Sequence, residues 1–251
     1  MNTTKNRHKG RRAVVIGASS GIGRQLTTLL LQDSWHVGIA ARREAPLEAL
    51  RKEFPGQVAW SRMDVTKEEA AGQLRLLIEE LGGMDLFLYV SGVGQRNPTL
   101  SPEIEETTLL TNGLGFTRMV GEAYRYFACR GKGQLAVISS IAGVRGLGPS
   151  PSYSATKALQ NTYIEALEQQ SQARGLRIRF TDIRPGFIDT PLLKGDAFPH
   201  TLPVDKAARS ILKAVYRQQH VAYVDGVWHA VAVLMRCIPK AIWRRLNLNR
   251  R

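Results

Sequence analysis

The sequence is poor in the features by which many proteins are cross-linked, anchored or exported. Its 251 residues include two cysteines, Cys129 and Cys237, and neither lies in a C-x-x-C motif or a Cys/His cluster. We therefore expect no disulfide framework and no metal site, and a reducing, cytoplasmic setting. No apolar run approaches the roughly 18 residues of a membrane-spanning helix. Residues 1–12 are basic but lack the apolar segment of a secretory signal.

Acidic residues are also missing from both ends of the chain. Residues 1–12 carry a charge of +5 and residues 228–251 a charge of +6, with no Asp or Glu in either segment. The whole chain has a net charge of +14, so the body between the tails is nearly balanced. Basicity confined to two tails favours contact with an anionic surface over recognition of a nucleic acid, which we do not expect as a partner.

The body of the chain alternates between two kinds of segment. Seven short apolar runs rich in β-branched residues predict strands, and the segments between them predict helices. Strands that are apolar throughout and separated by helices indicate a parallel sheet buried on both faces. We therefore expect a single α/β domain with a doubly wound sheet of about seven strands and helices on both faces. The predicted strands are 13–18, 36–42, 57–65, 84–92, 133–140, 176–186 and 220–226; the predicted helices are 21–34, 44–54, 66–81, 103–130, 151–175 and 205–219.

A glycine-rich turn, GASSGIG, joins the first predicted strand to the first helix. In open α/β sheets ligands bind at the carboxyl ends of the strands, where a helix N-terminus offers free N–H groups to a pyrophosphate. Small residues in the turn allow the backbone to come close to such a ligand. The alternative is a glycine-rich turn that binds nothing. The candidate cofactor-binding residues here are Gly17, Ser19, Ser20, Gly21, Ile22 and Gly23.

The second predicted strand ends in AARR, without the acidic residue that binds the ribose 2′-hydroxyl of NAD. Arg42 and Arg43 suit the 2′-phosphate of NADP(H) instead, because guanidinium groups bind phosphate oxygens in pairs. The alternative is two solvated loop arginines. Asp64 and Val65 follow the third strand. Asp64 could accept a hydrogen bond from an adenine amino group, or cap the helix expected to begin at Thr66.

The stretch YSATK places Tyr153 and Lys157 four residues apart, on one face of a predicted helix. Together with the glycine turn and the Asp64-Val65 pair, this order of motifs resembles the short-chain dehydrogenase/reductase family over about residues 12–226. Ser140 lies 13 residues before the tyrosine, as the family's serine does, and Asn112 matches the family's catalytic asparagine. Gly92 matches the glycine after the fourth strand. The family's Pro-Gly-x-x-x-Thr segment corresponds to Pro185, Gly186, Ile188 and Thr190.

The resemblance implies a Rossmann-type fold in residues 13–226, an NADP(H) cofactor and a homodimer or homotetramer. It assigns catalysis to Ser140, Tyr153, Lys157 and Asn112, with Ser139 as the alternative serine. Tyr153 would protonate the carbonyl oxygen while Ser140 holds it. Lys157 and the positive nicotinamide ring of NADP⁺ would both lower the pKa of Tyr153, and Lys157 would also bind the nicotinamide ribose. Asn112 would bend its helix and seat a water, or simply satisfy a kink.

The cofactor-binding residues implied by the resemblance extend beyond the glycine turn and the two arginines. They include Asp64, Val65, Gly92, Tyr153, Lys157, Pro185, Gly186, Ile188 and Thr190. In place of the family's Asn-Asn-Ala-Gly, this chain has YVSG from Tyr89 to Gly92.

Three segments are expected to line the substrate pocket: 93–98, 141–151 and 186–200. They are mostly apolar and include Phe187, Leu192 and Phe198, which favours an apolar or lipid-like ketone or aldehyde. Arg96 and Arg145 either bind an anionic end of the substrate or lie in solvent. The resulting hypothesis is an NADPH-dependent carbonyl reductase. The alternatives are a catalytically idle NADP(H)-binding sensor and a protein that binds an anionic surface.

Residues 227–251 form a basic extension with amphipathic spacing. Six apolar residues would form a single helical stripe, with Arg236, Lys240 and Arg244 on another face, and Pro239 would kink or split the helix. The stripe either packs on the domain or anchors the protein to an anionic membrane surface. Its members are Trp228, Val231, Met235, Ile238, Ile242 and Leu246.

Overall fold

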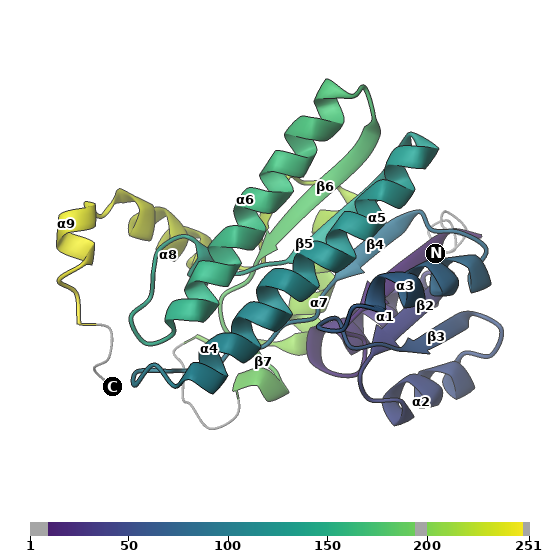
Figure 1. Ribbon diagram of the computed structural model, residues 1–251, viewed down its shortest axis with the longest axis horizontal. Helices are drawn as coiled ribbons and strands as arrows, with labels where there is room; N and C mark the ends of the chain where they lie inside the picture. The colour runs from purple at the N-terminus through teal and green to yellow at the C-terminus, as the bar shows by residue number, and fades with distance from the viewer. Residues whose placement is uncertain (1–9, 194–199, 248–251) are drawn as a thin grey trace.

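The computed structural model describes residues 10–193 and 200–247, and its centre is a seven-stranded, fully parallel sheet (Figure 1). The strand order is β3-β2-β1-β4-β5-β6-β9. This confirms the predicted doubly wound sheet. The strands are β1 (Arg12–Ile16), β2 (His36–Ala41), β3 (Val58–Arg62), β4 (Leu86–Tyr89), β5 (Lys132–Ile138), β6 (Arg177–Arg184) and β9 (Val221–Tyr223).

Helices bury the sheet from both sides, as strands that are apolar throughout require. On one face α1 (Gly21–Gln32), α2 (Ala45–Glu53) and α7 (Val204–Tyr216) pack on the odd-numbered residues of β1, including Ala13 and Val15. On the other face α3 (Ala70–Glu80), α5 (Phe116–Arg130) and α6 (Pro151–Ala173) cover Val14 and Ile16. The order reverses at β1, which pairs with both β2 and β4, so the ligand-binding crevice is expected beyond the carboxyl ends of these strands.

Two predicted helices have different bounds in the structure. The helix expected from Thr66 begins at Ala70, because Asp64 accepts hydrogen bonds from the Thr66 amide and hydroxyl and holds a separate turn. The tract predicted at 103–130 is divided into α4 (Pro102–Thr108), a π-helical segment (Leu109–Gly115) and α5. Such segments are uncommon and often occur at functional sites.

The carboxyl-terminal part adds short elements around the end of β6. A small parallel pair joins β7 (Ile188–Asp189) to β8 (Leu202–Pro203), and 3-10 turns lie at Ile141–Gly143 and Pro191–Leu193. The chain ends in α8 (Gly226–Cys237) and α9 (Lys240–Trp243), separated around Pro239 as the sequence predicted. Figure 1 shows α8 and α9 at the end of the molecule opposite α2 and β3.

The predicted apolar stripe of the extension is only partly correct. Trp228 is buried, and Val231, Met235 and Ile238 are partly buried, so this part of the stripe packs on the domain. Ile242 and Leu246 are exposed, because the break at Pro239 turns α9 away from the line of α8. Residues 1–9 of the basic amino-terminal tail and residues 248–251 lie outside the described residues. Within the described ranges, no helix is long and apolar enough to cross a membrane.

Candidate active site

The glycine turn lies at the carboxyl end of β1, where side chains larger than hydrogen do not fit. Gly17 has a φ of +96°, and a Cβ atom there would lie 2.7 Å from the Ser91 amide nitrogen. A Cβ atom at Gly23 would lie 2.1 Å from the Gly17 carbonyl oxygen. Among the described residues, the Ser20 side chain makes no capping bond to α1, and the first turn of α1 holds no acidic residue. The turn therefore presents free backbone donors and a positive dipole end, which fit a pyrophosphate.

The two arginines after β2 lie beside this turn. Arg43 donates from Nη2 to the Ser19 hydroxyl over 3.1 Å, which brings its guanidinium to the glycine turn. Arg42 is exposed, and its charge acts on Asp64. The carboxyl end of β2 is therefore strongly positive, which suits a phosphate better than a ribose hydroxyl.

Asp64 and Val65 follow β3 at the carboxyl edge of the sheet. Burial alone would raise the pKa of Asp64, but hydrogen bonds from Thr66 and the charges of Arg42 and Lys67 lower it, so the carboxylate is ionised. Of the two predicted roles, the structure shows Asp64 capping the turn at Thr66. Val65 is buried, and its carbonyl accepts a hydrogen bond from Arg118 on α5.

Ser140 and Tyr153 meet at the carboxyl end of β5. Ser140 follows β5 and is a hydrogen-bonding neighbour of Tyr153, which lies in the first turn of α6. Burial raises the pKa of Tyr153, and the hydrogen bond with Ser140 opposes the rise. Lys157 alone does not lower this pKa, because burial of the phenol is the dominant effect; the lowering expected from Lys157 together with the nicotinamide ring of NADP⁺ stays a prediction. Ser139 instead donates to Asp182 and to the Ile183 carbonyl, which gives it a structural role.

Lys157 lies one turn after Tyr153, on the same face of α6. Its Nζ is 5.7 Å from the centroid of the Tyr153 ring and donates to the Ile138 carbonyl over 3.0 Å. Burial lowers the pKa of Lys157 to about 8, and the negative charge of Asp182 opposes this effect. The ammonium is therefore confined in a largely desolvated place beside the phenol ring.

Asn112 occupies the middle of the π-helical segment and is fully buried. Its side chain exchanges two hydrogen bonds with the Val93 backbone, of 2.7 and 2.9 Å, and so fixes the loop after β4. A Cβ atom at Gly92 would lie 3.2 Å from the Asn112 Oδ1 and 3.7 Å from the Lys157 Nζ. Asn112, Gly92 and Lys157 are therefore immediate neighbours in space.

Gln160 is a buried residue of this site that the sequence analysis missed. Its Oε1 accepts a hydrogen bond from Lys157 Nζ over 3.0 Å, and its Nε2 donates to the Asn112 carbonyl over 2.9 Å. One amide thus connects two of the predicted catalytic residues. Its spacing of three residues from Lys157 on α6 could have indicated a contact with the lysine. Nothing in the sequence indicated that Gln160 is buried against the π-helical segment.

Gly94 lies in the segment 93–98, which was predicted to line the substrate pocket, although the sequence did not single out this residue. A Cβ atom there would lie 2.8 Å from the Tyr153 ring, so the backbone of the 93–98 segment packs directly on the phenol. The segment is held by the buried Asn97, whose Nδ2 donates to Glu105 over 2.8 Å. Glu105 also accepts from Ser152, one residue before the tyrosine.

The segment after β6 lies near both Ser140 and the glycine turn. The Pro185 carbonyl accepts from the Ile141 amide over 3.0 Å, next to Ser140. Ile188 is buried in β7, and Thr190 lies near Gly21, where a Cβ atom would be 3.3 Å from its methyl group. The structure thus brings Pro185 next to Ser140 and Thr190 next to the glycine turn, and cofactor binding by Pro185, Ile188 and Thr190 stays a prediction. Phe198 and the rest of 194–199 lie outside the described residues.

Arg145 has neither of its predicted environments. From the loop between Ser140 and Tyr153 it donates to the carbonyls of Met235 (3.0 Å), Arg236 (2.8 Å) and Ile238 (3.0 Å) at the end of α8. A cation at a helix C-terminus stabilises the free carbonyls there. Trp243 in α9 donates to Gly146 in the same loop over 2.8 Å. The extension is thus fastened to the loop that separates two candidate catalytic residues.

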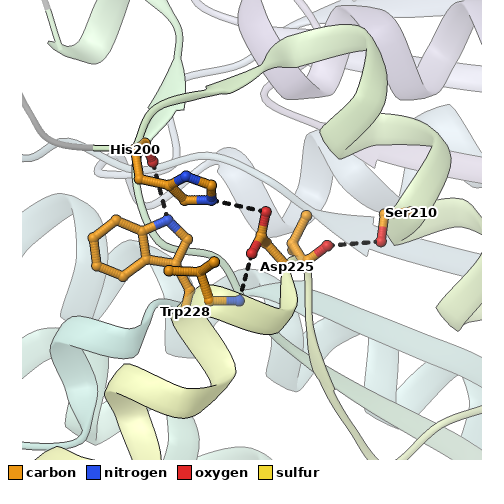
Figure 2. A network of polar contacts seen from close by, with 6 residues as sticks. His200, Ser210, Asp225 and Trp228 are labelled. Carbon is orange, nitrogen blue, oxygen red and sulfur yellow. Dashed lines mark hydrogen bonds and ion pairs between the residues drawn. The ribbon is translucent and has the colours of Figure 1, made fainter.

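The start of α8 contacts His200, the last residue of the segment 186–200 that was predicted to line the substrate pocket (Figure 2). Asp225 caps α8 through the Val227 amide and also binds His200 Nε2 over 3.0 Å. The Trp228 indole donates to the His200 carbonyl, and its ring packs on Gly186, where a Cβ atom would lie 2.2 Å away. Within the described part of the chain, no grouping of His, Cys, Asp and Glu could hold a metal ion.

A doubly wound parallel sheet with a glycine-rich turn at its switch point defines a Rossmann-type protein. Residues 11–197 match the model of the short chain dehydrogenase family, and the chain belongs to that family. It is therefore an oxidoreductase of the short-chain dehydrogenase type.

Similar proteins agree with this assignment. An uncharacterized oxidoreductase of Myxococcus xanthus is 37% identical over 75% of this chain and 76% of that protein. The glycine betaine reductase ATRR of Emericella nidulans is 32% identical over 85% of this chain, which corresponds to 18% of that much longer protein. Among solved structures, gox2181 has a TM-score of 0.79 at 22% identity, covering 92% of this chain and all of the other. ElxO with NADP bound has a TM-score of 0.77 at 19% identity, covering 88% and 99%.

Proposed function

We propose that this oxidoreductase uses NADPH to reduce the carbonyl group of an apolar ketone or aldehyde. The observation that carries the cofactor is the pair of arginines at the end of β2, one of which already contacts the glycine turn through Ser19. The turn fits the dinucleotide because Gly17 and Gly23 leave no room for a Cβ atom. The solved structure of ElxO, which has the same fold, has NADP bound.

When bound, NADPH supplies the hydride that reduces the carbonyl carbon. The chain contributes the proton and the polar contacts. Because burial raises the pKa of Tyr153, its hydroxyl stays protonated near neutral pH and is ready to donate to the carbonyl oxygen. Ser140, beside it, donates a hydrogen bond to the same oxygen as negative charge develops.

Lys157 and Asn112 support this pair rather than meet the carbonyl. Lys157, held by Ile138 and Gln160, would bind the ribose hydroxyls of the cofactor and keep a positive charge near the phenol. Asn112 fixes the Val93 backbone, and thus the loop whose Gly94 packs on the Tyr153 ring. Ser140, Lys157 and Asn112 are buried around the partly buried Tyr153. The presence of all four residues in one site favours an active enzyme over an idle sensor.

We also propose that the protein works as a homodimer or homotetramer. The π-helical segment exposes Leu109, Leu110 and Leu114, with exposed fractions of 51%, 46% and 48%. Three exposed leucines within two turns form an apolar patch that a second copy could cover. Light scattering of the full chain, with a Leu110→Lys variant for comparison, tests this proposal.

The reaction is tested by following NADPH oxidation over a panel of aliphatic and aryl ketones and aldehydes. Tyr153→Phe is expected to remove nearly all turnover while NADPH still binds, because the ring is kept and only the proton donor is lost. Tyr163→Phe, on the same helix, is the matched control and should retain activity. Turnover in Tyr153→Phe at the wild-type rate would refute the proposed acid, and a wild type that binds NADPH without turning over any carbonyl would favour the sensor.

A further inference from the structure

Helix α8 has apolar side chains on two opposite sides, and one of these sides is not covered by the domain. Trp228 and Ala232 are buried against the domain. The opposite side, which we call the outer face, consists of exposed Val227, Ala230, Val233, Leu234 and Cys237. Leu234 is 62% exposed and Val233 47%. A shallow, mainly apolar groove runs along this side and is lined by Gly226, His229, Ala230, Val233, Leu234 and Cys237. The apolar side of a helix is normally covered by a partner, and His229 and Arg236 are the polar residues beside this one.

Positive charge surrounds the outer face. Arg236, Lys240, Arg244 and Arg245 are all exposed, and no acidic residue follows Asp225 in the sequence. In α9 and just after it, Ile242 and Leu246 are exposed, at 55% and 43%. Apolar and cationic side chains therefore alternate over one short stretch, without the anionic residues that usually neutralise a protein surface.

From this surface we infer that the outer face of α8, with α9, binds the surface of an anionic lipid bilayer. Apolar side chains would enter the boundary between headgroups and acyl chains, and the arginines and lysine would lie among anionic headgroups. A second copy of this chain is a poorer occupant, because pairing two such faces brings two cationic segments together. A nucleic acid would leave the apolar groove unfilled.

The position of α8 gives this contact a consequence for the site. One end of α8 is held by Trp228 and Asp225 against the His200 loop, and the other end by Arg145 in the loop before Tyr153. Lipid bound to the outer face would therefore lie beside both loops expected to surround the substrate. An apolar carbonyl compound dissolved in the bilayer would be concentrated at these loops. Lipid binding itself does not depend on the proposed reaction, so the two can fail separately.

The test is co-sedimentation of the full chain with vesicles of phosphatidylcholine alone and of phosphatidylcholine with phosphatidylglycerol. We expect binding to the anionic vesicles, release as salt rises, and little binding to the neutral ones. Leu234→Glu should weaken binding about fivefold or more, since it removes apolar contact and adds a repelled charge. Lys240→Glu with Arg244→Glu should weaken it further, by about fivefold per residue.

Two matched controls lie at the other end of the molecule. Leu76→Glu replaces a leucine on α3 that is 65% exposed, and Arg51→Glu with Lys52→Glu reverses two exposed charges on α2. Both should bind vesicles like the wild type. Negligible sedimentation of the wild type with anionic vesicles would overturn the inference, as would equal losses in controls and variants. Light scattering that shows a dimer abolished by Leu234→Glu, without any lipid binding, would assign the outer face to a second copy.

Discussion

The low pKa of Lys157 predicts a stability that rises with pH. Its folded-state pKa is about 8, against an ordinary value of 10.5, because burial penalises the ammonium more than Asp182 stabilises it. At about 1.4 kcal/mol per pH unit, this difference corresponds to about 3 kcal/mol of folding free energy lost at neutral pH. Between pH 8 and 10.5 the unfolded chain holds a proton that the folded chain has released, so the free energy of unfolding rises with pH across this window.

Lys157→Met removes this titration while keeping an unbranched side chain of similar length. The variant also loses the hydrogen bonds to Ile138 and Gln160. Their loss changes the free energy of unfolding by an amount that depends little on pH. We therefore expect the wild-type stability, relative to the variant, to rise by about 2–3 kcal/mol between pH 7 and pH 10. Urea denaturation followed by the fluorescence of the four tryptophans measures it.

Lys213→Met is the matched control, because Lys213 is exposed on α7 and water solvates its ammonium in both states. Its stability difference from the wild type should stay constant over the same range. If the stability difference between the wild type and Lys157→Met also stays constant with pH, or changes in the opposite direction, burial of the ammonium does not outweigh its attraction to Asp182.

Three further predictions concern side chains around the site. Arg42→Ala and Arg43→Ala should each weaken NADPH binding about 10- to 100-fold in fluorescence titrations, and change NADH binding about twofold at most. Arg62→Ala is the control, and equal losses of affinity for both cofactors would contradict a 2′-phosphate contact. Gln160→Leu should lower kcat about tenfold and move the kcat–pH profile to lower pH, because the ammonium of Lys157 loses a hydrogen-bond acceptor. Gln160→Glu should move the profile to higher pH, and a profile that does not move in either variant would assign Gln160 to packing alone. Arg145→Gln should raise KM for apolar substrates more than it lowers kcat, and should speed hydrogen exchange of the α8 amides. Unchanged exchange would show that α8 stays packed on the domain without the Arg145 hydrogen bonds.

The parts of the site that could be predicted from the sequence are those set by local spacing. Gly17 and Gly23 are required within one turn, and Tyr153 and Lys157 share a helix face through their spacing alone. The sheet was predictable for a similar reason, since apolar strands separated by helices have few other arrangements.

The unpredicted parts depend on contacts between distant segments. Arg145 finds its acceptors about 90 positions later, at Met235 and Ile238. Gln160 matters because a π-helical segment 48 residues earlier brings the Asn112 carbonyl within reach. The Tyr153 pKa follows burial, which the sequence does not report. Periodicity indicated the apolar face of α8 that packs on the domain, but not the opposite face that stays exposed.

The attachment of Arg145 to the end of α8 has a consequence for biosynthesis. A ribosome releases the chain from its amino terminus, so β1 to β6 and both core layers emerge before Met235, Arg236 and Ile238 exist. The loop between Ser140 and Tyr153 gains these three hydrogen bonds only after α8 has left the ribosome. The Rossmann-type body can thus form early, whereas the loop between Ser140 and Tyr153 is completed by residues made about 90 positions after Arg145.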